Sequence, residues 1–178
     1  MRFNVVKKLT VFGLTLLVVV FSTSVVFAQL INIAVPADPD SFDPVRTVAA
    51  ATAEIAFNIY EGLVKATPAG QVEGALASSW TVDDTKTIYT FYLRDALFHD
   101  GTAVTVNDVV YSLNRARDPE IAVRAGELGA IKSIEPLDGG VRIELHQPHG
   151  AFLYTLAEMY AVIYPAHAKN LAQHPVGT

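Results

Sequence analysis

The chain has 178 residues, with 13 Lys or Arg, 18 Asp or Glu and no Cys, so its formal net charge is −5. The missing cysteines exclude a disulfide scaffold, a thiol nucleophile, a thiolate zinc site and a lipid-modified cysteine, and the acidic balance argues against a nucleic-acid-binding protein. Apolar residues make up 51% of the chain and charged residues 17%, which predicts a folded protein, and the length is that of about one domain.

The first 28 residues have the layout of a secretory signal peptide. Arg2, Lys7 and Lys8 form a positive start, and the stretch Leu9–Ala28 carries no charge. A membrane anchor is the alternative, because ~20 apolar residues can span a bilayer. Polar residues at 22–24 interrupt the apolar run just before Ala28, which favours a signal peptide cleaved after that residue.

Removal of this segment changes the charge of the protein. Three of the 13 basic residues and none of the acidic residues lie in residues 1–28, so the remainder carries a net charge of −8. We expect an acidic exported protein without disulfides, located in the periplasm or another extracytoplasmic space and stabilised by core packing alone.

The next elements alternate between short strands, loops and helices. The apolar run Leu30–Val35 predicts a strand, and three prolines predict a loop over residues 36–44. The stretch Thr52–Tyr60 is predicted to be helical, with Thr52 as its N-cap and Gly62 just beyond its end.

The middle of the chain contains a predicted hairpin followed by a helix. Alternating apolar residues indicate strands over Thr81–Asp84 and Thr87–Arg94. After a turn at Asp100-Gly101, Thr105 and Asp108 have the spacing of a capping pair, which predicts a helix that ends near Arg117.

The last part predicts a second hairpin, a helix and a strand. Ile131–Pro136 and Val141–Leu145 flank a turn sequence with two glycines. A short helix is expected over Ala151–Glu158, and a strand over Tyr160–Tyr164. Consecutive strands joined by tight turns indicate an α+β fold.

Two clusters of residues could hold a metal ion. The acidic loop with Asp38, Asp40 and Asp43 lacks the spacing of an EF-hand, and turn residues that cap their own backbone are the favoured interpretation. His146 and His149 flank a proline that disfavours a helix, so their imidazoles need not converge.

Other candidates for chemistry are weak. His99 and Asp100 could form a general-base pair, although a turn is the favoured interpretation. Trp80 is expected to be a core or inter-strand aromatic residue rather than a platform for ligand stacking. The sequence contains none of the common hydrolase, nucleotide-binding or zincin motifs, so we expect no enzymatic activity and no cofactor.

Several segments together resemble the extracytoplasmic solute-binding proteins of ABC importers, in the family that binds dipeptides, oligopeptides and nickel complexes. The segments that carry the resemblance are, in chain order, Ser41-Phe42-Asp43-Pro44, Tyr60-Glu61-Gly62-Leu63-Val64, Leu76-Ala77-Ser78-Ser79-Trp80, Tyr89-Thr90-Phe91-Tyr92-Leu93-Arg94, Phe98-His99-Asp100-Gly101-Thr102, Val106-Asn107-Asp108-Val109-Val110-Tyr111-Ser112, Arg115, Asp118-Pro119 and His174-Pro175-Val176-Gly177-Thr178. One departure is Gly74, which stands where the family usually has a proline.

The resemblance implies part of a two-lobed periplasmic binding protein type II fold. The implied division is a signal peptide over 1–28, the first strand and ligand-side segment of lobe I over 29–52, an extra α+β subdomain over 53–165, and the start of a return to lobe I over 166–178. Members of the family are much longer, so the resemblance implies an N-terminal fragment that would not close on a solute by itself.

The resemblance also implies a binding segment and partners. In peptide-binding members, the extended segment after the Asp-Pro dipeptide pairs its backbone with the peptide; here this segment is Thr47, Val48, Ala49 and Ala50. The alternative is that the alanines simply start the following helix. The implied partners are a peptide or similar small solute and ABC permease subunits in the membrane, with the binding protein a monomer.

Three alternatives remain open from the sequence. One is an exported metal-dependent hydrolase that uses His99 or the pair His146 and His149. Another is a nickel-complex-binding transport protein, and the third is a membrane-tethered interaction module, if Leu9–Ala28 is retained.

Overall fold

The computed structural model describes residues 33–35 and 37–178. The expected signal peptide and residues 30–32 of the expected first strand lie outside this range, and residues 33–35 carry no strand. None of the described helices has the length and apolar character needed to cross a membrane.

The largest element is a four-stranded antiparallel sheet in the order β3-β4-β6-β5. Its strands are β3 (Ala77–Val82), β4 (Ile88–Leu93), β5 (Ile131–Leu137) and β6 (Gly140–Leu145). Both hairpins expected from the sequence are therefore confirmed, although β3 begins four residues earlier than expected.

Turn residues explain the two hairpins. The Asp83 carboxylate accepts hydrogen bonds from the backbone N–H groups of Thr87 and Ile88 at 3.0 and 2.8 Å. Gly139, between β5 and β6, has a φ of 70°, which glycine adopts without steric cost.

The two faces of this sheet differ in polarity. Phe91, Val141 and Ile143 point to the inner face and are fully buried. The outer face carries ion pairs between neighbouring strands, such as Arg142 with Glu135 at 2.9 Å. This alternation is that of an antiparallel sheet with one face on a core and one in water.

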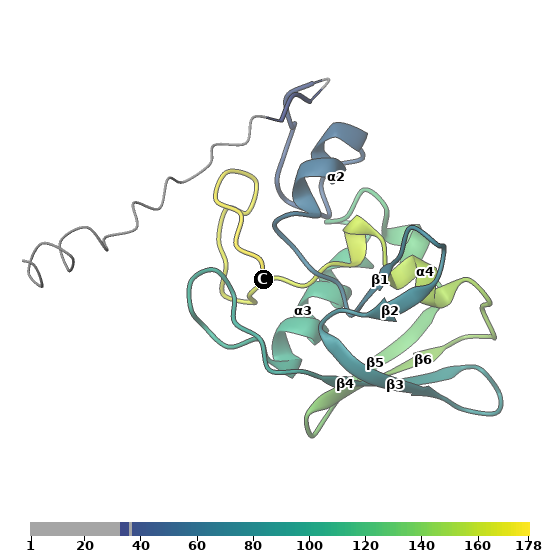
Figure 1. The fold of residues 1–178 in the computed structure, drawn as a ribbon. Coiled ribbons are helices and arrows are strands. Elements are labelled where there is room, and N and C mark those ends of the chain that lie inside the picture. The colour runs from purple at the N-terminus through teal and green to yellow at the C-terminus, as the bar shows by residue number, and fades with distance from the viewer. Residues whose placement is uncertain (1–32, 36) are drawn as a thin grey trace, which may run out of the picture. The chain divides into compact units, whose positions relative to one another are not determined.

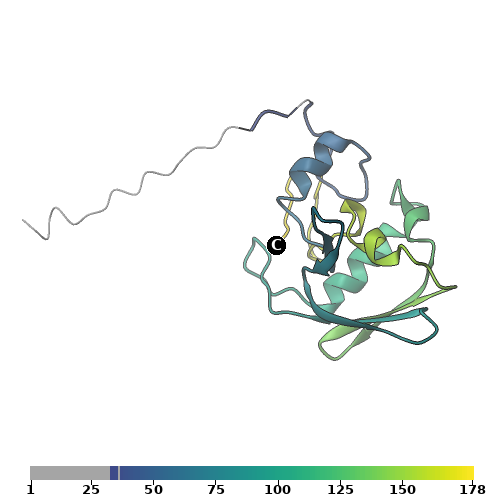
Figure 2. The same ribbon diagram turned by 45° about the vertical axis from the view of Figure 1, so that its right-hand side comes forward.

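Helix α3 (Val106–Ala116) packs on the inner face through Val109 and Leu113. Thr105 is its N-cap in a full capping box with Asp108, as expected: the Thr105 N–H donates to the Asp108 carboxylate at 2.9 Å, and the Asp108 N–H donates to Thr105 Oγ1 at 3.4 Å. Figures 1 and 2 show α3 and the short helix α4 (Phe152–Leu156) on the same side of the sheet.

A second, two-stranded sheet was not expected from the sequence. Its strands are β1 (Val64–Ala66) and β2 (Val72–Gly74), each only three residues long. The turn between them is held by the Tyr154 hydroxyl of α4, which donates to the Gly70 carbonyl oxygen at 2.7 Å.

The prediction of a strand over Tyr160–Tyr164 is wrong. Met159–Ala161 forms a 3-10 helix, and only Ile163 pairs, through an isolated bridge with Glu61. The physical reason is that the buried Ser112 hydroxyl accepts from the Tyr164 N–H and donates to the Tyr164 carbonyl oxygen, both at 3.1 Å. A side chain thus takes the place of a neighbouring strand.

Helix α2 covers Ala50–Ala56, and its N-cap is Ala49 rather than Thr52. The expected capping role of Thr52 is wrong because its hydroxyl is buried and donates to Asp40 Oδ1 at 2.8 Å. Beyond α2, Tyr60, Tyr164 and Leu171 belong to a second, smaller apolar cluster. The fold is mixed helix and sheet, as expected for an α+β protein. The expected division of the chain into lobe I and subdomain segments at residues 29–52, 53–165 and 166–178 stays a prediction.

Candidate ligand-binding site

The four residues expected to bind a ligand line one concave site, which we call the Thr47 pocket. Its volume is about 150 Å³. The residues that line it are Thr47, Val48, Ala49, Ala50, Ala53, Arg124, Glu158, Met159 and Tyr160. The structure thus brings the segment 47–50 together with side chains from two distant parts of the chain.

One carboxylate fixes both ends of this segment. Asp40 Oδ1 accepts a hydrogen bond from Thr47 Oγ1 at 2.6 Å and one from Thr52 Oγ1 at 2.8 Å. The hydrogen bond from Thr47, and after it that from Thr52, holds the pKa of the Asp40 carboxyl below its ordinary value. Because Thr47 and Thr52 are buried, the residues between them are presented on a rigid support.

The backbone between these anchors is open on one side. Ala49 is extended, with φ −72° and ψ 124°, and Val48 is 61% exposed. The Ala49 N–H donates to Thr47 Oγ1 at 3.1 Å, whereas the N–H and carbonyl oxygen of Val48 have no hydrogen-bond partner in the described part of the chain. An extended backbone with free polar groups can pair with another extended chain.

Residues 49–51 do not share one conformation, and the binding role of this segment stays a prediction. Ala49 is extended, whereas Ala50 is the first residue of α2. Ala49 is therefore extended, Thr47 and Val48 belong to neither a helix nor a strand, and Ala50 begins the helix.

Charged and aromatic side chains face this segment across the pocket. Arg124 lies over the Tyr160 ring, with its guanidinium carbon 5.9 Å from the ring centroid. The pKa of Tyr160 is raised to about 12, mainly by burial and less by the charges of Glu127 and Glu158, while Arg124 opposes the shift. Sequence reasoning missed Arg124, Glu158 and Tyr160 because no local pattern connects them with residues 47–50.

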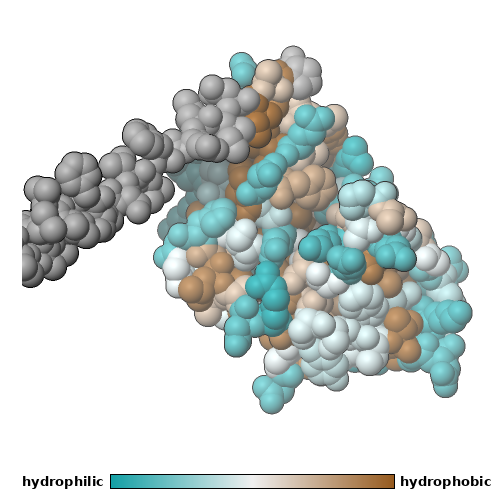
Figure 3. Space-filling view, in the orientation of Figure 1, coloured by the Kyte–Doolittle hydropathy of each residue, from teal (hydrophilic) through white to brown (hydrophobic). Residues whose placement is uncertain are grey.

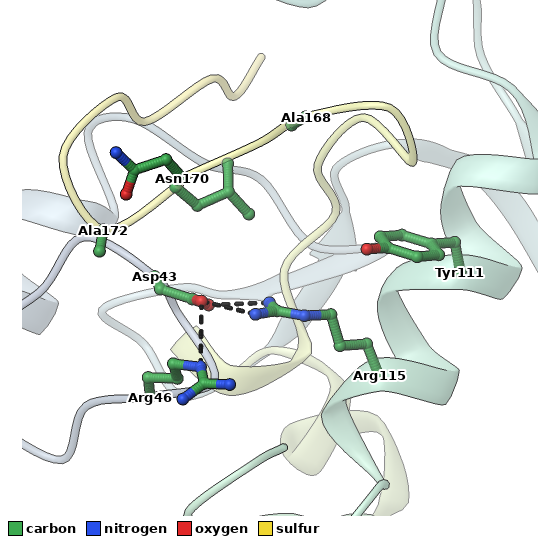
Figure 4. Close-up of a pocket in the computed structure, with 8 residues that line it drawn as sticks. Asp43, Arg46, Tyr111, Arg115, Ala168, Asn170 and Ala172 are labelled. Carbon is green, nitrogen blue, oxygen red and sulfur yellow. Dashed lines mark hydrogen bonds and ion pairs between the residues drawn. The ribbon is translucent and has the colours of Figure 1, made fainter.

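A buried ion pair supports the loop that leads into the segment. The two terminal nitrogens of Arg115, on α3, donate to the two carboxylate oxygens of Asp43 at 2.8 and 2.5 Å. Arg115 also donates to the Tyr164 hydroxyl at 3.0 Å, and its pKa is raised, mainly by the hydrogen bond to Asp43. Figure 4 shows Asp43 between Arg115 and Arg46, whose Nε lies 3.7 Å away.

This ion pair lines a second hollow of about 260 Å³, which is closed on one side by residues 168–172 (Figure 4). The only signs of it in the sequence were that Asp43 lies in the Ser-Phe-Asp-Pro motif and that Arg115 continues the resemblance. Neither residue type nor spacing identifies the pair, because 72 residues separate its members.

The surface near α2 is more apolar than the surface over the sheet. Val48 and Phe57 are 61% and 51% exposed and lie at the two ends of α2. In Figure 3, brown surface gathers at the top of the molecule, where α2 lies, and the part over β3 and β4 is mostly white or teal.

The residues considered for metal binding or catalysis are not gathered into one cluster in the described part of the chain. No group of three His, Asp or Glu side chains suited to a metal ion occurs among the described residues, and His146 and His149 are exposed. Asp100 pairs with His167 at 3.0 Å instead of with His99, whose Nδ1 accepts from the Gly177 N–H at 3.4 Å.

The turn at Asp100-Gly101 is confirmed, with Gly101 at a φ of 83°. Trp80 is partly buried and packs against the core, 6.3 Å from Phe91 between ring centroids, which confirms its structural interpretation. Arg94 forms an ion pair with Glu61 at 2.6 Å, and Asp108 caps α3 together with Thr105.

Comparison with known proteins identifies the fold. The structure of AgaA from A. tumefaciens R10, in complex with agropinic acid, matches with a TM-score of 0.72 and 35% identity over 79% of this chain and 30% of that one. DppA from Helicobacter pylori, in complex with the peptide STSA, matches with a TM-score of 0.68 and 30% identity over 80% of this chain and 34% of that one. The chain therefore contains part of a type II periplasmic binding protein fold.

Sequence comparison gives the same result. The probable D,D-dipeptide-binding periplasmic protein DdpA of Escherichia coli K12 is 34% identical over 93% of this chain and 35% of its own length. The chain thus spans about a third of the length of this relative. Residues 71–178 match the model of the bacterial extracellular solute-binding proteins, family 5, middle region, a family that binds substrates rather than transforming them. The chain belongs to the bacterial extracellular solute-binding proteins of family 5.

Proposed function

We propose that this protein is the extracytoplasmic solute-binding component of an ABC importer, with a dipeptide or oligopeptide as its solute and membrane permease subunits as its partners. Membership of family 5 supports the class of function. The names of DdpA and of the DppA complex support a peptide as the solute. A two-lobed member of such a family would close on its solute by hinge motion and present the closed form to the permease.

The observation that carries the peptide proposal is the open backbone of Val48 in the Thr47 pocket. A bound peptide would place its own extended backbone beside Thr47–Ala49 and exchange hydrogen bonds with the free N–H and carbonyl oxygen of Val48. Thr47, Val48, Ala49 and Ala50 are the proposed ligand-binding residues.

The residue types in this segment fit broad selectivity. Ala49 and Ala50 add little bulk to the pocket, and backbone hydrogen bonds do not depend on the side chains of the peptide. Selectivity would then come from side chains elsewhere around the pocket.

The cellular setting forms part of the proposal. Export through a signal peptide over residues 1–28, cleaved after Ala28, would place the protein in the periplasm as a monomer. DdpA, which is described as a periplasmic protein, aligns with 93% of this chain, and this supports the proposed location. N-terminal sequencing of the exported protein tests this step, with Gln29 as the expected first residue and Met1 as the contradicting one.

Calorimetric titration of the intact exported protein with Ala-Ala and Ala-Ala-Ala tests the peptide proposal. Val48→Pro removes the N–H at the centre of the segment, and we expect affinity to fall by about tenfold, which corresponds to one lost hydrogen bond in a desolvated site. Val48→Ala keeps this N–H and is expected to cost much less. Thermal unfolding of each variant checks that it is folded.

Two results would contradict the proposal. If the wild-type protein binds neither peptide, the solute is not a simple peptide. If Val48→Pro is folded and binds as tightly as the wild type, the backbone of Val48 does not pair with the solute.

A further inference from the structure

Arg124 differs from the other arginines of the described residues in having neither an ion-pair nor a hydrogen-bond partner for its guanidinium. Arg46, Arg94, Arg115 and Arg142 each form an ion pair with a carboxylate, and Arg117 donates to a backbone carbonyl oxygen. Within residues 33–35 and 37–178, the guanidinium of Arg124 makes no hydrogen bond and has no carboxylate within 4.0 Å.

The backbone beside Arg124 is nevertheless anchored next to the Thr47 pocket. The N–H of its neighbour Val123 donates to the carbonyl oxygen of Val45 at 3.0 Å, which ties the two backbones together beside the segment 47–50. The guanidinium lies over the ring of Tyr160, which is only 8% exposed and therefore forms a firm platform. A cation held at the wall of a pocket is available to a ligand there.

We infer that Arg124 is a specificity-determining residue that binds a carboxylate of the solute in the Thr47 pocket. The inference rests on the proposed function, and it deepens it by assigning the chemical class of solute that the pocket selects: one with a free carboxylate. The planar guanidinium offers parallel N–H donors that match the two oxygens of a carboxylate, which a lysine ammonium does not.

Glu158 would favour one orientation of a bound zwitterionic solute. Glu158 lines the same pocket as Arg124 and carries the opposite charge, which acts on the neighbouring Tyr160. A zwitterionic solute that directs its carboxylate to Arg124 would meet a negative side chain elsewhere on the wall, which fits an amine better than a second acid.

The test combines a substitution that removes a charge from the protein with a ligand that lacks the carboxylate charge. The probes are Ala-Ala-Ala with a free carboxyl terminus and the same tripeptide as its carboxyl-terminal amide, titrated into the intact exported protein at one fixed salt concentration. Arg124→Gln is expected to weaken binding of the free acid by about tenfold, the loss of a charge-assisted hydrogen bond, and to leave binding of the amide nearly as in the wild type. Arg124→Lys should fall between these two proteins for the free acid.

Arg142→Gln is the matched control, because it changes the net charge by the same amount on the outer face of the sheet, where Arg142 pairs with Glu135. We expect its affinity for both probes to match the wild type. If it weakens the acid as much as Arg124→Gln does, the effect is one of overall charge and the inference is overturned.

The remaining outcomes separate this inference from the proposed function. Suppose that the wild type binds both tripeptides. If Arg124→Gln then weakens the acid and the amide equally, or weakens neither, the role of Arg124 is overturned and the peptide function stands. If the wild type binds neither tripeptide, the proposed function fails and the assignment of Arg124 fails with it.

Discussion

The four-stranded sheet and the region around the Thr47 pocket are held together in different ways. The sheet buries apolar side chains such as Phe91, Val141 and Ile143 against α3 and α4. The pocket region relies on two carboxylates: Asp40 joins two threonines, and Asp43 joins the loop to α3 through Arg115. Stability in the sheet is therefore spread over many apolar contacts, whereas around the Thr47 pocket a few polar contacts carry much of it.

This difference fits the tasks of the two regions. Apolar packing tolerates small adjustments, because many weak contacts share any change. Hydrogen bonds depend on distance and angle, so a network of them holds the segment Thr47–Ala49 in one geometry. Substitutions in the two regions should therefore behave differently.

The largest effect is expected in the sheet. Phe91→Ala removes a fully buried ring at the centre of β4, and we expect the free energy of unfolding to fall by about 4 kcal/mol, since transfer and cavity terms add. Urea unfolding measures this loss. Tyr92→Ala, at the next position but 44% exposed, should cost far less, and equal losses would show that the sheet does not have one buried face.

The second-largest effect is expected from loss of the buried ion pair between Arg115 and Asp43. Arg115→Met leaves the Asp43 carboxylate, whose side chain is 7% exposed, without its main partner, and should cost about 3 kcal/mol. Arg142→Met breaks the exposed pair with Glu135 and should cost at most about 1 kcal/mol. Urea unfolding of both variants gives the two values.

A double variant tests whether the stability lost in Arg115→Met comes from the unpaired Asp43 carboxylate. Asp43→Asn combined with Arg115→Met removes both charges, so its loss should be smaller than the sum of the two single losses. Additive losses would mean that Asp43 and Arg115 contribute independently and that the pair is not the link between the loop and α3.

The smallest effect concerns pH and Asp40. Its pKa is lower in the folded protein than the ordinary value of 3.8, because Thr47 and Thr52 donate to the carboxylate. The unfolded chain therefore binds a proton first as pH falls, so the stabilising contribution is complete above pH 3.8 and disappears as pH falls through the lower, folded pKa. Unfolding midpoints measured from pH 6 to pH 2.5 should decline less steeply in Asp40→Asn than in the wild type.

Asp38→Asn is the control for this titration, because the Asp38 carboxylate accepts no hydrogen bond from the described residues. Its acid profile should match that of the wild type. A wild-type profile in Asp40→Asn, or the same flattening in both variants, would contradict the role of Asp40.

Local patterns made much of the sheet region predictable. Period-two alternation and turn residues such as Asp83 and Gly139 identified both hairpins, and Thr105 with Asp108 identified the start of α3. The strands β1 and β2 escaped because three residues are too few to show a period. The turn between them also accepts a hydrogen bond from Tyr154, a long-range contact that no local pattern reveals.

The site was predictable only through resemblance. The segment Thr47–Ala50 followed from its place after the Asp-Pro dipeptide, and its role stays a prediction. Thr52 was misjudged as an N-cap because threonine serves equally well there or as a partner for a carboxylate, and its partner Asp40 lies 12 residues away. Tertiary contacts between distant residues decided such positions.

The bridge between Glu61 and Ile163 has a consequence for how such a chain can evolve. The Ile163 N–H donates to the Glu61 carbonyl oxygen at 2.8 Å, so the chain leaves toward the sheet and returns from it at one place. A stretch with adjoining ends can be exchanged, lengthened or excised and its ends rejoined by a short link, without moving the backbone on either side. A replacement for the stretch between Glu61 and Ile163 would have to keep Arg115 for Asp43 and Arg124 for the Thr47 pocket, so these contacts limit which part of the sheet region can vary.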